Sequence, residues 1–148
     1  MSIVNIINGS ILAPHLKSGI QAIQRKYRNK ICNGTPLNSV DIDTTQQRNQ
    51  PNANRWDYLI VATKSNTQIA VFVEIHSAYS CEVGTVIKKY DWLRNFISTN
   101  LRTVQLGSAK YFWLSSAGIH IPKQTPQYKR LARHPFLRLQ TNLDLSKI

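Results

Sequence analysis

Three side chains at the ends of two apolar segments have the types and spacing of a metal-dependent hydrolytic site. Asp57 precedes the apolar run 58–63, Glu74 lies within the run 69–75, and His76 follows it. Carboxylates bind divalent cations, and an imidazole beside them can accept a proton or bind the metal. Together these groups could hold Mg²⁺ or Mn²⁺ and activate a water molecule.

The polar segment 64–68 between the two runs predicts a β-hairpin, because both runs are rich in β-branched residues. With Ser65 and Asn66 as the central turn residues, Asp57 faces Glu74 at roughly 4.5–5.5 Å between Cβ atoms, and His76 lies on the same face. Like charges placed opposite each other destabilise a sheet, so a bound cation is one explanation. The alternatives are two solvated acids at a strand end, or a one-residue slip that separates them.

This arrangement, continued by a helix and another strand, resembles the core of the PD-(D/E)XK nuclease superfamily over roughly residues 56–118. The family has an acid at the start of one strand and an acid, any residue and Lys at the end of its antiparallel partner. The resemblance implies a restriction-endonuclease-like α/β core and Mg-dependent endonuclease activity. It also implies that Asp57 and Glu74 are the ligands of Mg²⁺ or Mn²⁺.

His76 stands where this family has its lysine, which leaves three alternatives open. His76 acts as base or metal ligand, or Lys88 or Lys89 reaches the site from the following helix, or the site is inactive. The resemblance makes Lys88 a catalytic candidate, because it lies near the start of that helix, where the superfamily sometimes relocates its lysine. Some members of the family supply a further acid from the first helix, and the expected first helix here has none, so either the site has few carboxylates and one metal or Glu82 is the extra ligand.

The remaining segments predict a single α/β domain over residues 1–148, with a mixed sheet around the central hairpin and helices beside it. We expect a helix from about Ser80 with an apolar stripe, a buried strand at 110–115 continued by 118–121, a helix after Thr125-Pro126 and an edge strand at 136–139. Apolar residues at steps of three and four predict a helix from near Pro14 to near Gly34. Residues 35–55 are predicted to form a flexible loop, with a short edge strand at 40–43.

The charge of the chain indicates a polyanionic partner. Nineteen Lys and Arg residues against seven Asp and Glu give a formal net charge of +12, which favours nucleic acid, DNA or RNA, bound in a salt-sensitive way. No segment joins a continuous basic face to a long apolar one, so a membrane surface is not expected. The expected nucleic-acid-binding residues form two clusters, one on each terminal helix: Lys17, Arg25, Lys26, Arg28 and Lys30, and Lys129, Arg130 and Arg133.

The first residues show neither the charged start nor the long apolar stretch of a signal peptide, so we expect a cytoplasmic protein. Cys32 and Cys81 are expected to be buried free thiols. Two other functions stay open: an inactive nucleic-acid-binding protein of the same fold, and a basic toxin or regulator with an acidic protein partner. A homodimer that acts on two strands is a further expectation.

Overall fold

The predicted hairpin is the centre of the fold. In the computed structural model, which describes residues 2–104 and 108–148, β4 (Tyr58–Lys64) pairs antiparallel with β5 (Thr67–Tyr79). Ser65 and Asn66 form the turn with φ values of 51° and 63°, as a type I′ turn requires. The pairing runs from Lys64 opposite Thr67 to Tyr58 opposite Val73, so the predicted register is confirmed.

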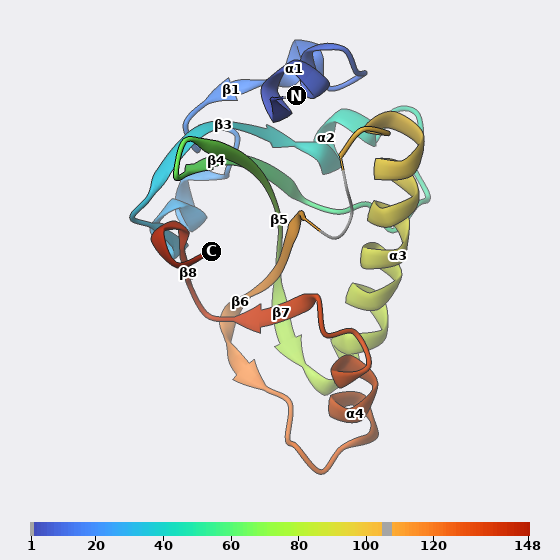
Figure 1. Cartoon of the computed structure of the whole chain (residues 1–148). Helices are drawn as coiled ribbons and strands as arrows, with labels where there is room; N and C mark the ends of the chain where they lie inside the picture. The colour runs from blue at the N-terminus through green and yellow to red at the C-terminus, as the bar shows by residue number, and fades with distance from the viewer. Residues whose placement is uncertain (1, 105–107) are drawn as a thin grey trace.

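The hairpin is extended on both sides into a mixed six-stranded sheet of order β1-β3-β4-β5-β6-β7. β1 (Lys17–Ser18) and β3 (Thr35–Asp41) continue it antiparallel on the β4 side, while β6 (Lys110–His120) and β7 (Leu137–Gln140) run parallel to β5. Figure 1 shows these strands crossing the molecule beside one long helix. The chain is therefore a single-domain α/β fold with a mixed sheet flanked by helices, as predicted.

The long helix α3 (Val83–Asn100) covers one face of the sheet. A short 3₁₀ turn, η3 (Ser80–Glu82), leads into it from β5, and α4 (Pro126–Ala132) packs against its N-terminal end (Figure 1). α1 (Ile3–Asn8), η1 (Ala13–His15) and α2 (Ile42–Gln46) close the same face towards the other end of the sheet. The buried stripe of α3 has the residues that the sequence predicts: Val83, Val86, Ile87, Tyr90, Leu93, Phe96 and Ile97.

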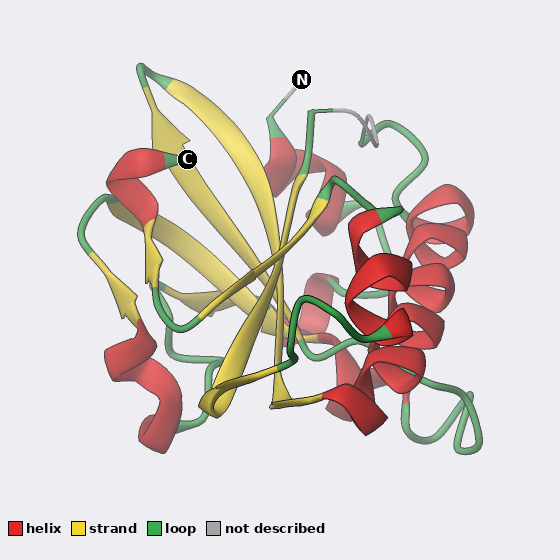
Figure 2. Ribbon diagram, turned by 90° about the horizontal axis from the view of Figure 1, so that it is seen from below, coloured by secondary structure: helices red, strands yellow, loops and turns green. Residues whose placement is uncertain are grey.

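The opposite face of the sheet is covered by short segments from the two ends of the chain. η2 (Arg25–Lys30) leads into β2 (Ile31–Cys32), which pairs parallel with β8 (Leu143–Asp144), and η4 (Leu145–Lys147) follows. Their apolar side chains form a second core with the hairpin side chains on the face of the sheet opposite α3. Figure 2 shows the sheet between these short segments and α3.

The helix predicted over residues 14–34 is wrong. The chain there forms β1, a turn at Gly19 with a φ of 54°, and the 3₁₀ helix η2. Ile23 and Ile31 are buried as the pattern indicates, but in the core on the η2 side. Apolar spacing of three and four residues also fits short 3₁₀ turns, and pairing with β3 here outweighs local helix propensity.

The loop predicted over residues 35–55 is replaced in its first half by β3 and α2. β3 lies between β1 and β4, so it is an interior strand and longer than the edge strand predicted at 40–43. Val40 is fully buried, while the polar residues before it lie at a sheet end with an irregular pairing. Low hydrophobicity conceals this strand because only its last part contributes to the core.

The elements near the C-terminus agree with the predictions. α4 begins at Pro126 after Thr125, whose hydroxyl accepts from the backbone N–H of Tyr128, and β7 is an edge strand. The cysteines differ, because both Cys32 and Cys81 are free but exposed. Within the described ranges, no helix is both long and apolar enough to cross a membrane.

Candidate functional site

The two hairpin acids converge where β4 begins. The backbone N–H of Asp57 donates to Glu74 Oε1 over 3.0 Å, and the N–H of Ile75 donates to Asp57 Oδ2 over 3.0 Å. Each carboxylate is thus held by the backbone of the opposite segment. Glu74 is fully buried, whereas the Asp57 side chain keeps 21% of its exposure.

The segment 41–55 positions Asp57 from the other side. The N–H groups of Ile42 and Asp43 at the start of α2 both donate to the Asp57 carbonyl oxygen. Arg55 pairs with Asp43 at 2.8 Å and also donates to the carbonyl oxygens of Gln50 and Pro51. The chain before Asp57 is therefore braced by its own polar residues, which explains its apolar-poor composition.

A lysine from α3 completes the site, and it is Lys89. Its Nζ donates to Glu74 Oε2 over 2.6 Å and lies 4.0 Å from Asp57 Oδ1. Lys88, the residue predicted, is exposed instead. Lys89 follows Val86 by three positions and precedes Leu93 by four, so it borders the buried stripe, whereas Lys88 points almost directly away from it. That helical phase is the signal in the sequence that distinguishes the two lysines.

His76 links the buried acid to a second, more exposed one. Its Nε2 lies 2.7 Å from Glu82 Oε2, and its Nδ1 lies 3.6 Å from Glu74 Oε2. The carboxylate of Glu74, and the hydrogen bond to Glu82, raise the pKa of His76 against the opposing effect of burial. The imidazole is therefore biased towards its cationic form, and a proton acceptor role would have to work against both acids.

Burial and neighbouring charges shift the pKa values of Asp57 and Lys89 in different ways. Burial, and then the nearby Glu74 carboxylate, raise the pKa of Asp57 to about 7, although Lys89 and the N–H of Ile75 partly offset this. Burial lowers the pKa of Lys89, but the two carboxylates raise it further, so its net shift is upward and the ammonium is retained. Asp57 is thus the group that would gain most from an additional cation.

Ser115 on β6 is a neighbour that the sequence gave no reason to select. It pairs with His76 across the parallel strands, so the two side chains share one face of the sheet. Its hydroxyl is buried and has no hydrogen-bond partner within the described part of the chain. Trp113, which pairs with Glu74 on the same two strands, donates its indole N–H to the His76 carbonyl oxygen over 3.0 Å.

The predicted nucleic-acid-binding residues do not form one groove. η2 packs on one face of the sheet and α4 on the other, so Arg25 and Lys26 are separated from Lys129, Arg130 and Arg133 by the sheet itself. Arg28 donates to the carbonyl oxygens of Ile23 and Gln21, which gives it a structural role. Lys17 lies on β1 at the sheet edge, and Lys30 donates to the Thr141 carbonyl oxygen. The α4 residues lie on the same face as the acids.

Comparison with protein-family models, curated proteins and solved structures finds no match for this chain. Among the described residues, no three His, Cys, Asp or Glu side chains are grouped so that they could hold a metal ion. Any metal at this site would therefore depend on the two carboxylates of Asp57 and Glu74, with other ligands from water or substrate.

Proposed function

We propose that this protein is a metal-dependent nuclease whose reacting groups are Asp57, Glu74 and Lys89. The observation that carries the proposal is the convergence of two carboxylates and one ammonium at the open end of a hairpin, in a chain of net charge +12. Acidic side chains are rarely buried unless they have a partner. The chain has only seven acids in 148 residues, and two of them meet here.

The two carboxylates fit Mg²⁺ or Mn²⁺ as ligands. Magnesium is usually held by one or two carboxylates and keeps several waters or substrate oxygens, so two protein ligands are sufficient. Asp57 Oδ1 accepts no hydrogen bond within the described ranges, and burial, followed by the Glu74 carboxylate, raises the pKa of Asp57, so a cation beside it would stabilise its charged form. When bound, the ion would polarise the scissile phosphate and lower the pKa of an attacking water.

The protein groups then have separate tasks. Asp57 and Glu74 hold the cation site, and the ammonium of Lys89 lies where it can face the developing charge on a phosphate. His76, held by Glu82, is placed to hydrogen-bond a water or a leaving oxygen. Each copy carries one such site, so cutting both strands of a duplex requires two copies or two binding events.

The net charge of the chain is the basis for the proposed partner. The excess of cations favours DNA or RNA through counterion release, and a cytoplasmic location would give access to both. The residues proposed to contact the nucleic-acid backbone on the same face as the acids are Lys129 and Arg130 of α4 and Arg133 directly after it.

Cleavage of labelled single-stranded and double-stranded DNA and RNA with Mg²⁺ or Mn²⁺ tests the proposal. Asp57→Asn removes the charge without changing the shape, and loss of several kcal/mol of transition-state stabilisation predicts a rate lower by on the order of 10²-fold or more. The matched control is Asp91→Asn, an exposed acid of α3. Equal rates for the wild type and Asp57→Asn, with binding intact in both, would exclude these acids as the reacting groups.

One observation favours a second function, a nucleic-acid-binding protein without cleavage. The ammonium of Lys89 already neutralises Glu74 Oε2 at 2.6 Å, so this oxygen is available to a cation only if Lys89 moves aside. Under this alternative, the protein binds nucleic acid in a salt-sensitive way and cuts no substrate with either metal.

A further inference from the structure

A pocket of about 290 Å³ lies between α3, β6 and the segment that follows α4, and neither Lys89 nor any of the hairpin acids lines it. Its floor is formed by Tyr90 of α3 and Tyr111 of β6, whose rings meet edge to face at 5.3 Å between centroids. Its rim is formed by Arg94 of α3 and by the segment between α4 and β7, Arg133, His134, Pro135 and Phe136. The pocket thus joins three elements that are distant in sequence.

The pocket combines two uncommitted cations with aromatic surface. Arg94 and Arg133 are exposed, and neither makes an ion pair within the described part of the chain. Arg94 lies over the Tyr90 ring at 5.7 Å from its centroid. Among the residues that the structure describes, Phe136 is the most exposed large apolar one, at 65%, although a ring of this size is normally covered.

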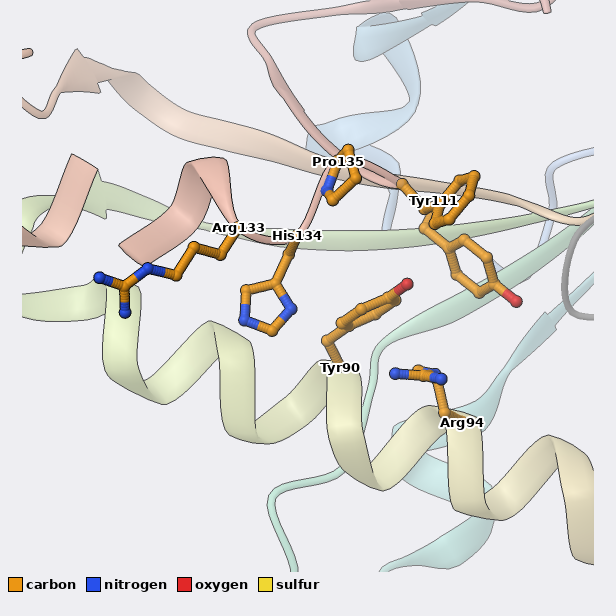
Figure 3. Close-up of a pocket in the computed structure, with 7 residues that line it drawn as sticks. Tyr90, Arg94, Tyr111, Arg133, His134 and Pro135 are labelled. Carbon is orange, nitrogen blue, oxygen red and sulfur yellow. The ribbon is translucent and has the colours of Figure 1, made fainter. Parts of the chain in front are cut away.

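The cations lie at opposite ends of the pocket. Figure 3 shows Arg133 at one end and Arg94 at the other, with the rings of His134 and Tyr90 between them. The His134 ring meets Tyr90 edge to face at 6.1 Å between centroids. Two guanidinium groups on either side of these rings suit a ligand that carries more than one anion.

We propose that this pocket binds an unpaired segment of nucleic acid, with phosphates at Arg94 and Arg133 and a base stacked against Phe136. Phosphates and bases match a pocket that carries both cations and rings, and aromatic stacking is the usual way in which proteins hold single strands. A duplex keeps its bases stacked on each other, so it cannot offer one to Phe136. An acidic peptide would satisfy the arginines but needs an aromatic residue at one particular position to cover the exposed ring, whereas every nucleotide carries a base.

The Tyr90 hydroxyl at the floor suits this ligand. Burial raises the pKa of Tyr90, so it keeps its proton at neutral pH. A protonated phenol can donate to the oxygens of a phosphate or base and carries no negative charge that would repel them.

This inference rests on the proposed nucleic-acid partner and names its class as single-stranded. The test measures binding of a short fluorescent single strand, and of a duplex of the same length, by anisotropy in EDTA so that nothing is cut. The variants are Arg94→Ala, Arg133→Ala and Phe136→Ala, and the control is Arg102→Ala, an exposed arginine after α3. Thermal unfolding of each variant checks that it is folded.

For single strands, each pocket-arginine variant is expected to lose roughly tenfold in affinity and to lower the salt slope by about 0.7. Phe136→Ala should lose roughly tenfold without a change in slope, because stacking releases no counterions. The inference is overturned if Arg102→Ala loses as much single-strand affinity as the pocket variants do. It is also overturned if the pocket variants lose as much affinity for the duplex as for the single strand, or if polyglutamate displaces the strand equally well from the wild type and from the pocket variants.

Cleavage by Asp57→Asn, measured separately, keeps the two proposals distinct. If Asp57→Asn stops cleavage while the pocket variants bind normally, the pocket inference fails and the nuclease proposal stands. If the wild type cleaves no substrate but the pocket variants lose single-strand affinity, the pocket inference stands and the protein binds nucleic acid without cleaving it.

Discussion

At the scale of single residues, the molecule depends on how one buried acid is neutralised. Glu74 is fully buried and accepts from the Asp57 N–H and from Lys89, with His76 close by. A buried carboxylate without a cation is strongly destabilising, because the desolvation cost of the charge is then not offset. Lys89 therefore has a structural role whether or not the site cuts a substrate.

Lys89→Met is expected to lower the free energy of unfolding by about 3–5 kcal/mol, since it keeps the side-chain length but removes the ammonium 2.6 Å from Glu74 Oε2 and leaves only the more distant His76. Lys88→Met removes the same charge from the adjacent exposed position and should change stability by less than about 0.5 kcal/mol. Urea denaturation at neutral pH measures both. Adding Glu74→Gln to Lys89→Met should recover part of the loss, because no unpaired charge then remains buried. Equal stability of the two lysine variants would contradict the pairing.

At the scale of elements, the tight turn explains why the hairpin could be predicted and the N-terminal region could not. A two-residue turn at Ser65 and Asn66 fixes every pair along both strands, so the meeting of Asp57 and Glu74 follows from counting. No comparable constraint acts on residues 14–34, where the same apolar spacing fits a helix and a set of short turns. Only the last residues of β3 fall within the strand predicted at 40–43, because the pairing of the rest with β4 cannot be recognised from the pattern of one segment.

The site shows the same division. The sequence named Lys88 and Lys89 as alternatives, and choosing between them needs the rotational phase of α3 on the sheet. The pocket at Tyr90 and Arg133 could not be predicted, because it exists only where α4 folds back on α3. Exposed arginines in separate helices give no sign in sequence that they share a pocket.

The small sheet β2–β8 ties the first third of the chain to its last residues, and it depends on Gly34. Gly34 has a φ of 65°, and a Cβ there would lie 2.6 Å from Leu145 Cβ and 2.9 Å from the Leu145 carbonyl carbon. Gly34→Ala is expected to lower the free energy of unfolding by about 2–4 kcal/mol, through backbone strain and overpacking together.

Gly19→Ala is the matched control for this prediction, to be measured by urea denaturation with Gly34→Ala. Gly19 has a φ of 54°, but nothing lies within 4 Å of the added Cβ, so only the backbone cost of about 1 kcal/mol applies. If both variants lose the same stability, contact with Leu145 does not constrain the C-terminal segment.

At the scale of the whole molecule, an excess of positive charge surrounds the largely buried acids Asp57 and Glu74. The net charge favours a polyanion, while Asp57 is unfavourably buried, and its pKa is raised to about 7 first by this burial and then by the Glu74 carboxylate. Proteins often hold such unfavourable groups at functional sites, at the expense of stability. Global stability therefore reports on the state of this site.

That relation predicts how the free energy of unfolding depends on pH. Between about pH 4 and pH 7 the folded state holds a proton on Asp57 that the unfolded state has lost, so stability falls as pH rises through this range. The loss is about 1.4 kcal/mol per pH unit and at most about 4 kcal/mol in total. Asp57→Asn has no such proton, so it should be more stable than the wild type at pH 8 and lose less stability between pH 4 and pH 8. Urea denaturation across this range measures the difference, which cancels the titration of groups common to both proteins, including His76.

A divalent cation should reverse this loss if Asp57 and Glu74 hold one. At pH 8 Asp57 is ionised, so Mn²⁺ at ten times its dissociation constant should raise the free energy of unfolding of the wild type by about 1.4 kcal/mol, and leave Asp57→Asn unchanged. At pH 5 protons compete for Asp57, so the same Mn²⁺ concentration should stabilise the wild type less. If Mn²⁺ stabilises both proteins equally, it binds elsewhere. If it stabilises neither while the pH dependence is as described, Lys89 is the permanent counter-ion of the site and the binding protein without cleavage is the better description.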